Sequence, residues 1–154
     1  MLECFAGDGL IWKEVKRITK RNIKILRIDQ KDDKKGIYLK GDNLKFLQSM
    51  DLSRFDVVDL DAYGSPFTQL EIIRAKQFKG IVHCKFIQSM FGALNKRMLF
   101  DLGYTKSMIE KIPSLFNKDG IQKLLEWVHI KTGAKQVHII TRQKKKHYFW
   151  FLMG

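Results

Sequence analysis

The sequence predicts an α/β fold, a doubly wound and mostly parallel sheet that finishes in a C-terminal antiparallel hairpin. Short apolar strand patterns alternate with helical patterns along most of the chain. Such alternation produces parallel strands that are joined by right-handed crossovers and covered by helices on both faces. Only four residues separate the last two strand patterns, and so short a connection requires an antiparallel pair.

Three strands and two helices are expected in the first third of the chain. Residues 1–5 and 23–28 are short apolar runs of strand length that are followed by polar turn residues. Residues 9–20 have the period of an amphipathic helix. The apolar side of this helix consists of Leu10, Ile11, Val15 and Ile18. A short strand at 36–40 then precedes a short helix at 43–50.

The middle of the chain continues the alternation. Residues 55–60 are an apolar strand, and Pro66 can open the helix expected at 66–77 because proline needs no N–H donor in the first turn. Residues 80–86 form the next strand, and a helical region is expected from 88 to about 112.

The last third supplies a helix and the hairpin. An apolar stripe predicts a helix at 118–132, and strands are expected at 136–142 and 147–152. The final strand contains Tyr148, Phe149, Trp150 and Phe151, which are expected to fill the sheet core with two side chains on each face.

Composition favours a single globular domain covering residues 1–154, with 45% hydrophobic residues. No apolar run approaches the ~20 residues that a membrane-spanning helix needs. Glu3 and Asp8 interrupt the apolar start, so the N-terminus does not resemble a signal peptide and a cytoplasmic location is expected. Two isolated cysteines, Cys4 and Cys84, make neither a disulfide framework nor a metal motif.

The net charge predicts a polyanionic partner. Lysine and arginine total 29 against 16 acids, which gives a formal charge of +13. A field of this sign attracts nucleic acids and speeds their encounter, although it also serves solubility. The basic residues at the final hairpin are expected to contact RNA, unless they form only a solvated turn: Arg142, Lys144, Lys145 and Lys146.

Acidic residues occur at four successive strand ends. They are Glu3, Asp29, Asp42 and the pair Asp59 and Asp61. Because ligands of doubly wound sheets bind beyond the carboxyl ends of the strands, these side chains are expected to meet at one binding rim. Carboxylates gathered there disfavour a phosphate ligand and favour a cationic ligand with hydroxyl groups. Each acid alone has another explanation, since Asp42 can cap the helix at 43–50.

A glycine turn, Ala6-Gly7-Asp8-Gly9, follows the first strand. Glycines let the backbone approach a ligand closely. The third glycine of the dinucleotide-binding pattern is replaced by Trp12, which counts against a nicotinamide-dependent oxidoreductase.

These motifs resemble those of a known enzyme family. The succession E-C-F-A-G-D-G, Asp29, G-D-N and D-L-D-A-Y-G-S-P is similar to the motifs of class I S-adenosylmethionine-dependent methyltransferases, whose sheet is Rossmann-like. The last segment resembles the D-x-D-P-F-G-S-P signature of the tRNA guanine-N2 dimethyltransferases and, more distantly, the D-P-P-Y box of amino-methyltransferases. The resemblance covers nearly the whole chain as a catalytic domain.

The resemblance implies S-adenosylmethionine as cofactor, no metal, and methyl transfer to an exocyclic amine, guanine N2 in tRNA. Its cofactor-binding residues would be Glu3, Phe5, Ala6, Gly7, Gly9, Asp29, Gln30, Asp42, Asn43 and Asp59. Among these, Asp29 would hold the ribose, while Asp42 and Asn43 would contact the adenine. The catalytic pocket would be formed by Asp61, Ala62, Tyr63 and Gly64, with Tyr63 stacked on the target base.

The chain departs from the family in two respects. Ala62 replaces the proline that follows the acid, and Met1 begins inside the first strand, so a catalytic domain that lacks the family's usual N-terminal extension is expected. We therefore expect a partner subunit or an oligomer to supply substrate-binding parts. Three alternatives remain open at this point: a catalytically silent or partner-dependent RNA-binding module, an adenine-N6 methyltransferase acting on RNA or DNA, and the disfavoured nicotinamide-dependent oxidoreductase.

Overall fold

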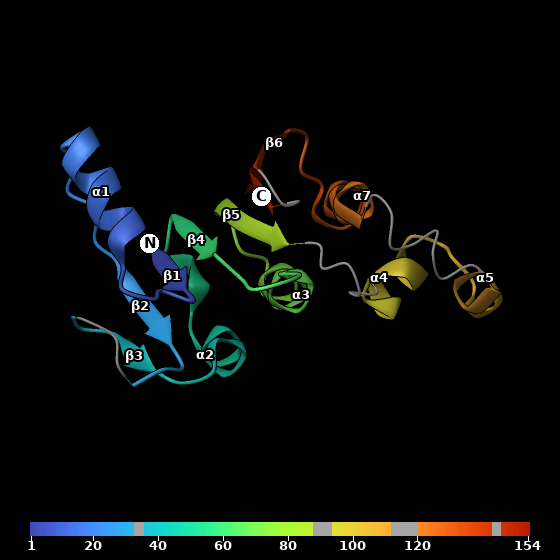
Figure 1. Ribbon diagram of the computed structural model, residues 1–154, viewed down its shortest axis with the longest axis horizontal. Helices are drawn as coiled ribbons and strands as arrows, with labels where there is room; N and C mark the ends of the chain where they lie inside the picture. Colours follow the sequence, from blue (N-terminus) through green and yellow to red (C-terminus); the bar gives the residue numbers. More distant parts are fainter. Residues whose placement is uncertain (33–35, 88–93, 112–119, 143–145) are drawn as a thin grey trace.

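The structure, a computed structural model, describes residues 1–32, 36–87, 94–111, 120–142 and 146–154. Strands and helices alternate through most of it (Figure 1). The first elements are β1 (Leu2–Cys4), α1 (Leu10–Thr19), β2 (Leu26–Asp29), β3 (Leu39–Lys40), α2 (Asn43–Ser49), the 3-10 helix η1 (Leu52–Arg54) and β4 (Val57–Leu60). The remaining elements are α3 (Phe67–Ala75), β5 (Gly80–Ile87), α4 (Lys96–Asp101), α5 (Lys106–Lys111), α7 (Gly120–Thr132), β6 (Val137–Arg142) and β7 (Lys146–Met153).

The strands form one sheet with the order β3-β2-β1-β4-β5-β7-β6. Strands β1 to β5 pair in parallel, and β7 runs antiparallel to both of its neighbours, β5 and β6. The strand order reverses direction beside β1, which places the binding rim at the carboxyl ends of β1 and β4. The predicted doubly wound sheet with a terminal antiparallel hairpin is confirmed.

Several strands are shorter than the sequence predicts. Strand β1 stops at Cys4, since Phe5 takes a left-handed φ of 67°. Strand β1 begins at Leu2, which is in register with Leu26, so β2 pairs only from Leu26 onward. The residues from 23 that were expected to belong to it lie outside the ladder. The region expected to be helical from 88 to about 112 contains α4 and α5, while residues 88–93 and 112 lie outside the described part.

The main core lies between the sheet and the helices α3 and α7 (Figure 1). On β5, Val82, Cys84 and Phe86 point into it and are buried. Trp127 of α7 is fully buried against Phe67 of α3 in an edge-to-face contact with 4.9 Å between ring centroids. This face of the sheet is therefore covered as the alternation predicts.

The opposite face is covered less completely by the residues that the structure describes. Helix α1 lies over it near β1 and β2, but none of its residues is buried (Figure 1). Ile11 and Ile18 remain 56% and 65% exposed. On β7, Phe149 and Phe151 face the core and are buried, whereas Tyr148 and Trp150 are only half-buried on the α1 side. The prediction that all four aromatic residues fill the core is correct for two of them.

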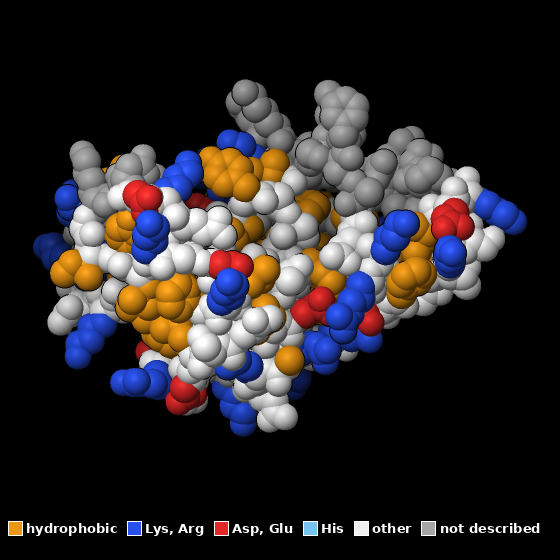
Figure 2. All heavy atoms as spheres, turned by 90° about the horizontal axis from the view of Figure 1, so that it is seen from below, with side chains coloured by type: hydrophobic (Ala, Val, Ile, Leu, Met, Phe, Trp, Pro, Cys, Tyr) orange, Lys and Arg blue, Asp and Glu red, His pale blue; other side chains and the backbone are white. Residues whose placement is uncertain are grey.

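The positive charge is distributed over the surface. Figure 2 shows lysine and arginine side chains spread across one face of the molecule, with fewer acids between them. Charge alone therefore does not single out a binding surface on this face. Among the described residues, no helix is long and apolar enough to cross a membrane.

Two acids are buried side by side in the sheet. Glu3 on β1 stands in register with Asp59 on β4 and is 4% exposed, and Asp59 is 2% exposed. Arg27 on β2, also in register with Glu3, places its Nε 3.3 Å from a Glu3 carboxylate oxygen. Burial and the neighbouring Asp59 nevertheless raise the pKa of Glu3 to about 7. Glu3 therefore takes up a proton more readily in the folded chain than in the unfolded chain.

We expect Leu124→Ala to lower the free energy of unfolding by about 2–5 kcal/mol, because Leu124 of α7 is fully buried in the core. Ile130 lies on the same helix and is 64% exposed, so Ile130→Ala is the control, with a change of about 0.5 kcal/mol or less. Urea unfolding measures both values. Equal losses for the two variants would contradict the packing described here.

The raised pKa of Glu3 predicts a pH-dependent contribution to stability. Because the pKa in the folded chain lies above the ordinary value of 4.5, this contribution is complete below pH 4.5 and is lost as the pH rises to about 7. The stability difference between wild type and Glu3→Gln should therefore change across this range, with the wild type losing stability relative to the variant. Glu126→Gln, an exposed change on α7, should leave the wild-type profile intact.

Candidate active site

The loop after β1 has an unusual backbone. Phe5, Gly7 and Gly9 all adopt left-handed φ values, of 67°, 51° and 64°. Such a conformation is strained for phenylalanine and easy for glycine. At Gly7 an added Cβ would meet no atom within 4 Å, so the loop presents bare backbone to open space there. At Gly9 it would collide with the guanidinium of Arg27. Because the guanidinium is the flexible end of the Arg27 side chain and can move aside, the left-handed φ is the stronger reason for glycine at Gly9.

Asp29, at the end of β2, fixes this loop. One carboxylate oxygen accepts a hydrogen bond of 2.9 Å from the backbone N–H of Gly7, and the other accepts one of 2.9 Å from the N–H of Lys31. Each carboxylate oxygen can accept more than one hydrogen bond, so Asp29 keeps acceptor capacity for a ligand. The first of these bonds ties the loop after β1 to the end of the neighbouring strand β2.

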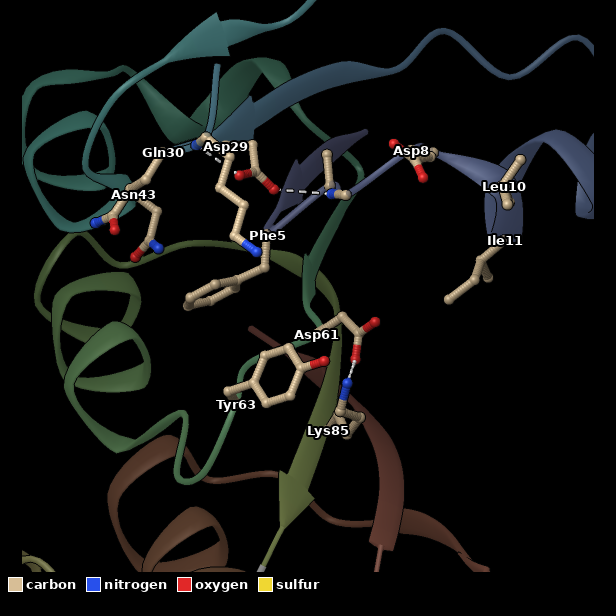
Figure 3. A pocket seen from close by; sticks show the side chains of 14 residues that line it. Phe5, Asp8, Leu10, Ile11, Asp29, Gln30, Asn43, Asp61, Tyr63 and Lys85 are labelled. Carbon is tan, nitrogen blue, oxygen red and sulfur yellow. Dashed lines mark hydrogen bonds and ion pairs between the residues drawn. The ribbon is translucent and has the colours of Figure 1, made fainter. Parts of the chain in front are cut away.

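A cavity of about 470 Å³ lies on this rim, within the range typical of ligand sites. In Figure 3, Asp29, Gln30 and Asn43 lie toward one end of it, and Asp61 and Tyr63 lie toward the other, with Phe5 between them. The sequence-predicted residues that line the cavity are Phe5, Ala6, Gly7, Gly9, Asp29, Gln30, Asn43, Asp61 and Tyr63. The predicted cofactor and target-base residues therefore share one hollow.

Asn43 and Asp42 occupy different environments although they are adjacent. Asp42 caps α2, because its Oδ1 accepts a hydrogen bond of 2.9 Å from the N–H of Leu44. Asn43 is 5% exposed, and its side-chain carbonyl accepts a hydrogen bond of 3.1 Å from Gln69. This bond orients the Asn43 amide, whose NH₂ group is the part suited to donate to a ligand acceptor.

At the other end of the cavity, Asp61, Tyr63 and Lys85 form a compact group. The ammonium of Lys85, on β5, is ion-paired with Asp61 and lies 5.0 Å from the centroid of the Tyr63 ring (Figure 3). The Lys85 side chain is 12% exposed, whereas Tyr63 is 91% exposed. The exposed Tyr63 ring can stack on a planar ligand. The adjoining carboxylate can accept a hydrogen bond from an amine on that ligand.

Five of the predicted site residues do not line this cavity. Glu3 is buried in the sheet beside Arg27, and Asp42 is a helix cap. Asp59 is also buried and is bound on both oxygens, by the indole N–H of Trp12 at 2.5 Å and by His83 at 2.7 Å. Trp12 lies in α1 and His83 in β5. Asp59 therefore joins the start of α1 to the sheet instead of facing the cavity.

Ala62 and Gly64 shape the turn that carries Tyr63. Ala62 is 2% exposed and donates its N–H to the carbonyl of Leu60. Gly64 has a left-handed φ of 96°, and its carbonyl accepts a hydrogen bond of 3.0 Å from Ile87 at the end of β5. These contacts hold the loop against β5 and leave the Tyr63 ring in the open.

Sequence reasoning missed five residues that line the cavity: Asp8, Leu10, Ile11, Lys31 and Lys85. Asp8, Leu10 and Ile11 continue the loop after β1 into α1, and Lys31 follows Asp29, so adjacency to predicted residues was the available signal. Lys85 had no such signal, because it lies inside a strand and reaches Asp61 only through the pairing of β4 with β5.

The chain matches no protein-family model and no curated protein sequence. Among solved structures, it is similar to the plantazolicin methyltransferase BamL in complex with a triazolic desmethylPZN analog and SAH. The two share 10% sequence identity and a TM-score of 0.55, over 99% of this chain and 76% of that chain.

A second similar structure is the SAH-bound methyltransferase PaMTH1 of Podospora anserina. It has 15% identity and a TM-score of 0.50, over 99% of this chain and 70% of that chain. At these identities the likeness is one of architecture, and it agrees with the strand order and the terminal hairpin. The chain therefore has the class I methyltransferase fold.

Proposed function

We propose that this chain binds S-adenosylmethionine and transfers its methyl group to an exocyclic amine of a nucleobase in RNA. One observation carries the proposal: Asp29 and the glycine loop line the same cavity as Asp61 and Tyr63. A cofactor half and a target half thus adjoin at the carboxyl ends of parallel strands, where ligands of this fold class bind. SAH, the demethylated form of this cofactor, is bound in both similar structures.

The residues of the cofactor half fit an adenosyl sulfonium compound. The exposed backbone at Gly7 leaves room for close approach, and Asp29 retains acceptor capacity for ribose hydroxyls. The NH₂ group of Asn43 can donate to a ring nitrogen of adenine. The carboxylates of Asp8, Asp29 and Asp61 line the cavity and can stabilise the positive charge of the sulfonium. The cofactor supplies an activated methyl group when it is bound.

The residues of the target half fit an amine on an aromatic ring. Tyr63 offers a stacking surface, and Asp61 accepts a hydrogen bond from the amine. As the N–C bond formed and the bond between the cofactor's methyl group and sulfur broke, positive charge would grow on the amine nitrogen. The nearby carboxylate would stabilise this charge until the nitrogen lost a proton to solvent. Lys85 can donate to a ring nitrogen or carbonyl beside that amine. A base in folded RNA must be splayed out to reach this pocket.

Guanine N2 in tRNA is the target we favour. The reason is the resemblance of residues 59–66 to the signature of the tRNA guanine-N2 dimethyltransferases. Asp61 can accept a hydrogen bond from an exocyclic amine while Lys85 donates to an acceptor atom beside that amine on the ring. Adenine also has an amine next to such an acceptor. Adenine-N6 transfer and a catalytically silent RNA-binding module therefore remain the alternatives that experiment must separate.

Calorimetric titration with SAH is expected to give one binding event. Asp29→Asn should lower the affinity for SAH about tenfold or more, because a hydrogen bond to a charged group is worth ~1.5–3 kcal/mol. Asp32→Asn removes an exposed acid three residues away and is the matched control, with wild-type affinity. A folded wild-type chain that binds neither SAH nor S-adenosylmethionine would refute the proposed function.

We expect Asp61→Asn to lower methyl transfer by about 10²–10³-fold, by analogy with the loss of one charge-stabilising group, while SAH affinity stays unchanged. The assay follows radiolabelled methyl groups onto unmodified tRNA transcripts, which are then digested to nucleosides. Methylguanosine is the expected product. Methyladenosine would favour the N6 alternative, and a weakened SAH affinity would reassign Asp61 to the cofactor half.

A further inference from the structure

A second cleft, of about 800 Å³, opens on the less covered face of the sheet beside the candidate active site. Its walls come from α1, β4, β5, β6 and β7. Ile11 and Asp61 line both this cleft and the first cavity, so the two hollows are contiguous. A ligand that reaches Asp61 can therefore extend onto the sheet.

Flat rings form much of the floor of this cleft. Trp150 stands in register with His83 on β5 and with His138 on β6, and its ring is stacked on that of His138 at 5.2 Å between centroids. Tyr148 is stacked on His83 at 6.5 Å. Tyr148 and Trp150 are both half-buried, so part of each ring remains accessible. Adjacent rings on neighbouring strands present a surface on which bases can stack.

Two cations lie at one end of the same floor. Arg142 on β6 and Lys146 on β7 stand in register, line the cleft and are exposed. The acids in the cleft are each paired, Asp59 with His83 and Asp61 with Lys85. Lysines and arginines are spread over the face seen in Figure 2, whereas here they adjoin stacked rings. Lys144 and Lys145, which were predicted to join this basic surface, lie outside the described residues.

We propose that this aromatic–basic cleft, formed by His83, Arg142, Lys146, Tyr148 and Trp150, binds a single-stranded nucleotide next to the target base. A neighbouring base stacks on Trp150, and the phosphate between the two nucleotides contacts Arg142 and Lys146. The inference deepens the proposed function and rests on it. The cleft thereby selects targets that are flanked by unpaired nucleotides, because a base inside a duplex has no free face to stack.

RNA fits the cleft better than a second protein does. Of the described residues that line it, only Ile11 and Ile140 are aliphatic, and the others carry rings or charged groups. Two other exposed aliphatic residues of α1, Leu10 and Ile18, do not line it. A protein contact would be expected to centre on apolar side chains, with few charges at its core.

The test measures binding of a fluorescein-labelled, 12-nucleotide single-stranded RNA by anisotropy, with SAH present. Trp150→Ala should weaken binding about 5- to 150-fold, since base stacking on an aromatic side chain is worth ~1–3 kcal/mol. Trp150→Phe keeps a stacking ring and should retain most of the affinity. Arg142→Gln should weaken RNA binding and reduce the salt dependence of the affinity. Arg74→Gln, an exposed change on α3, is the control and should have a smaller effect on both quantities.

Calorimetry with SAH on the same variants separates this inference from the proposed function. If Trp150→Ala and Arg142→Gln bind both SAH and RNA with wild-type affinity, the inference is overturned and the proposed function still stands. Light scattering at low and high salt provides a further criterion. A wild-type dimer that persists at high salt and dissociates in Trp150→Ala would assign the cleft to a second copy and also overturn the inference.

Discussion

The arrangement of the candidate active site depends on a row of polar side chains across the sheet, of which the two acids are buried. Arg27, Glu3, Asp59 and His83 occupy registered positions on β2, β1, β4 and β5. Two adjacent buried acids repel each other, and burying a charge is costly unless it is paired. Arg27 offsets the first acid, while Trp12 and His83 bind the second. These contacts fix where α1 begins and hence how the preceding glycine loop crosses the rim.

Above this row, the cavity is shaped by contacts between neighbouring strand ends. Asp29 holds the N–H of Gly7, and Lys85 pairs with Asp61 beside the Tyr63 ring. Both contacts join residues that are distant in sequence but adjacent through the sheet. The first leaves a bare backbone surface for a ligand, and the second keeps a carboxylate beside an exposed ring. The two halves of the proposed reaction thus share one scaffold of parallel strands.

Much of the fold could be predicted from sequence because its signals are local. Alternating strand and helix patterns predicted the parallel sheet, and the short connection before the last strand predicted the hairpin. Strand ends were less predictable, because the extent of β2 depends on which of its residues find partners on β1 and β3. Glu3 and Asp59 were expected to contact the cofactor, but pattern alone does not distinguish a carboxylate inside the sheet from one on its rim.

The sequence by itself determined the order of the elements, the glycine loop and the acids near successive strand ends. Tertiary structure decided which of those acids are accessible, because burial follows from which strands stand beside each other. It also brought Lys85 to Asp61 and left Tyr148 and Trp150 facing outward instead of into the core. A side chain's face is set by its position in a paired strand, but whether that face is covered depends on the helices that pack against it. Such packing is long-range and leaves no trace in local sequence pattern.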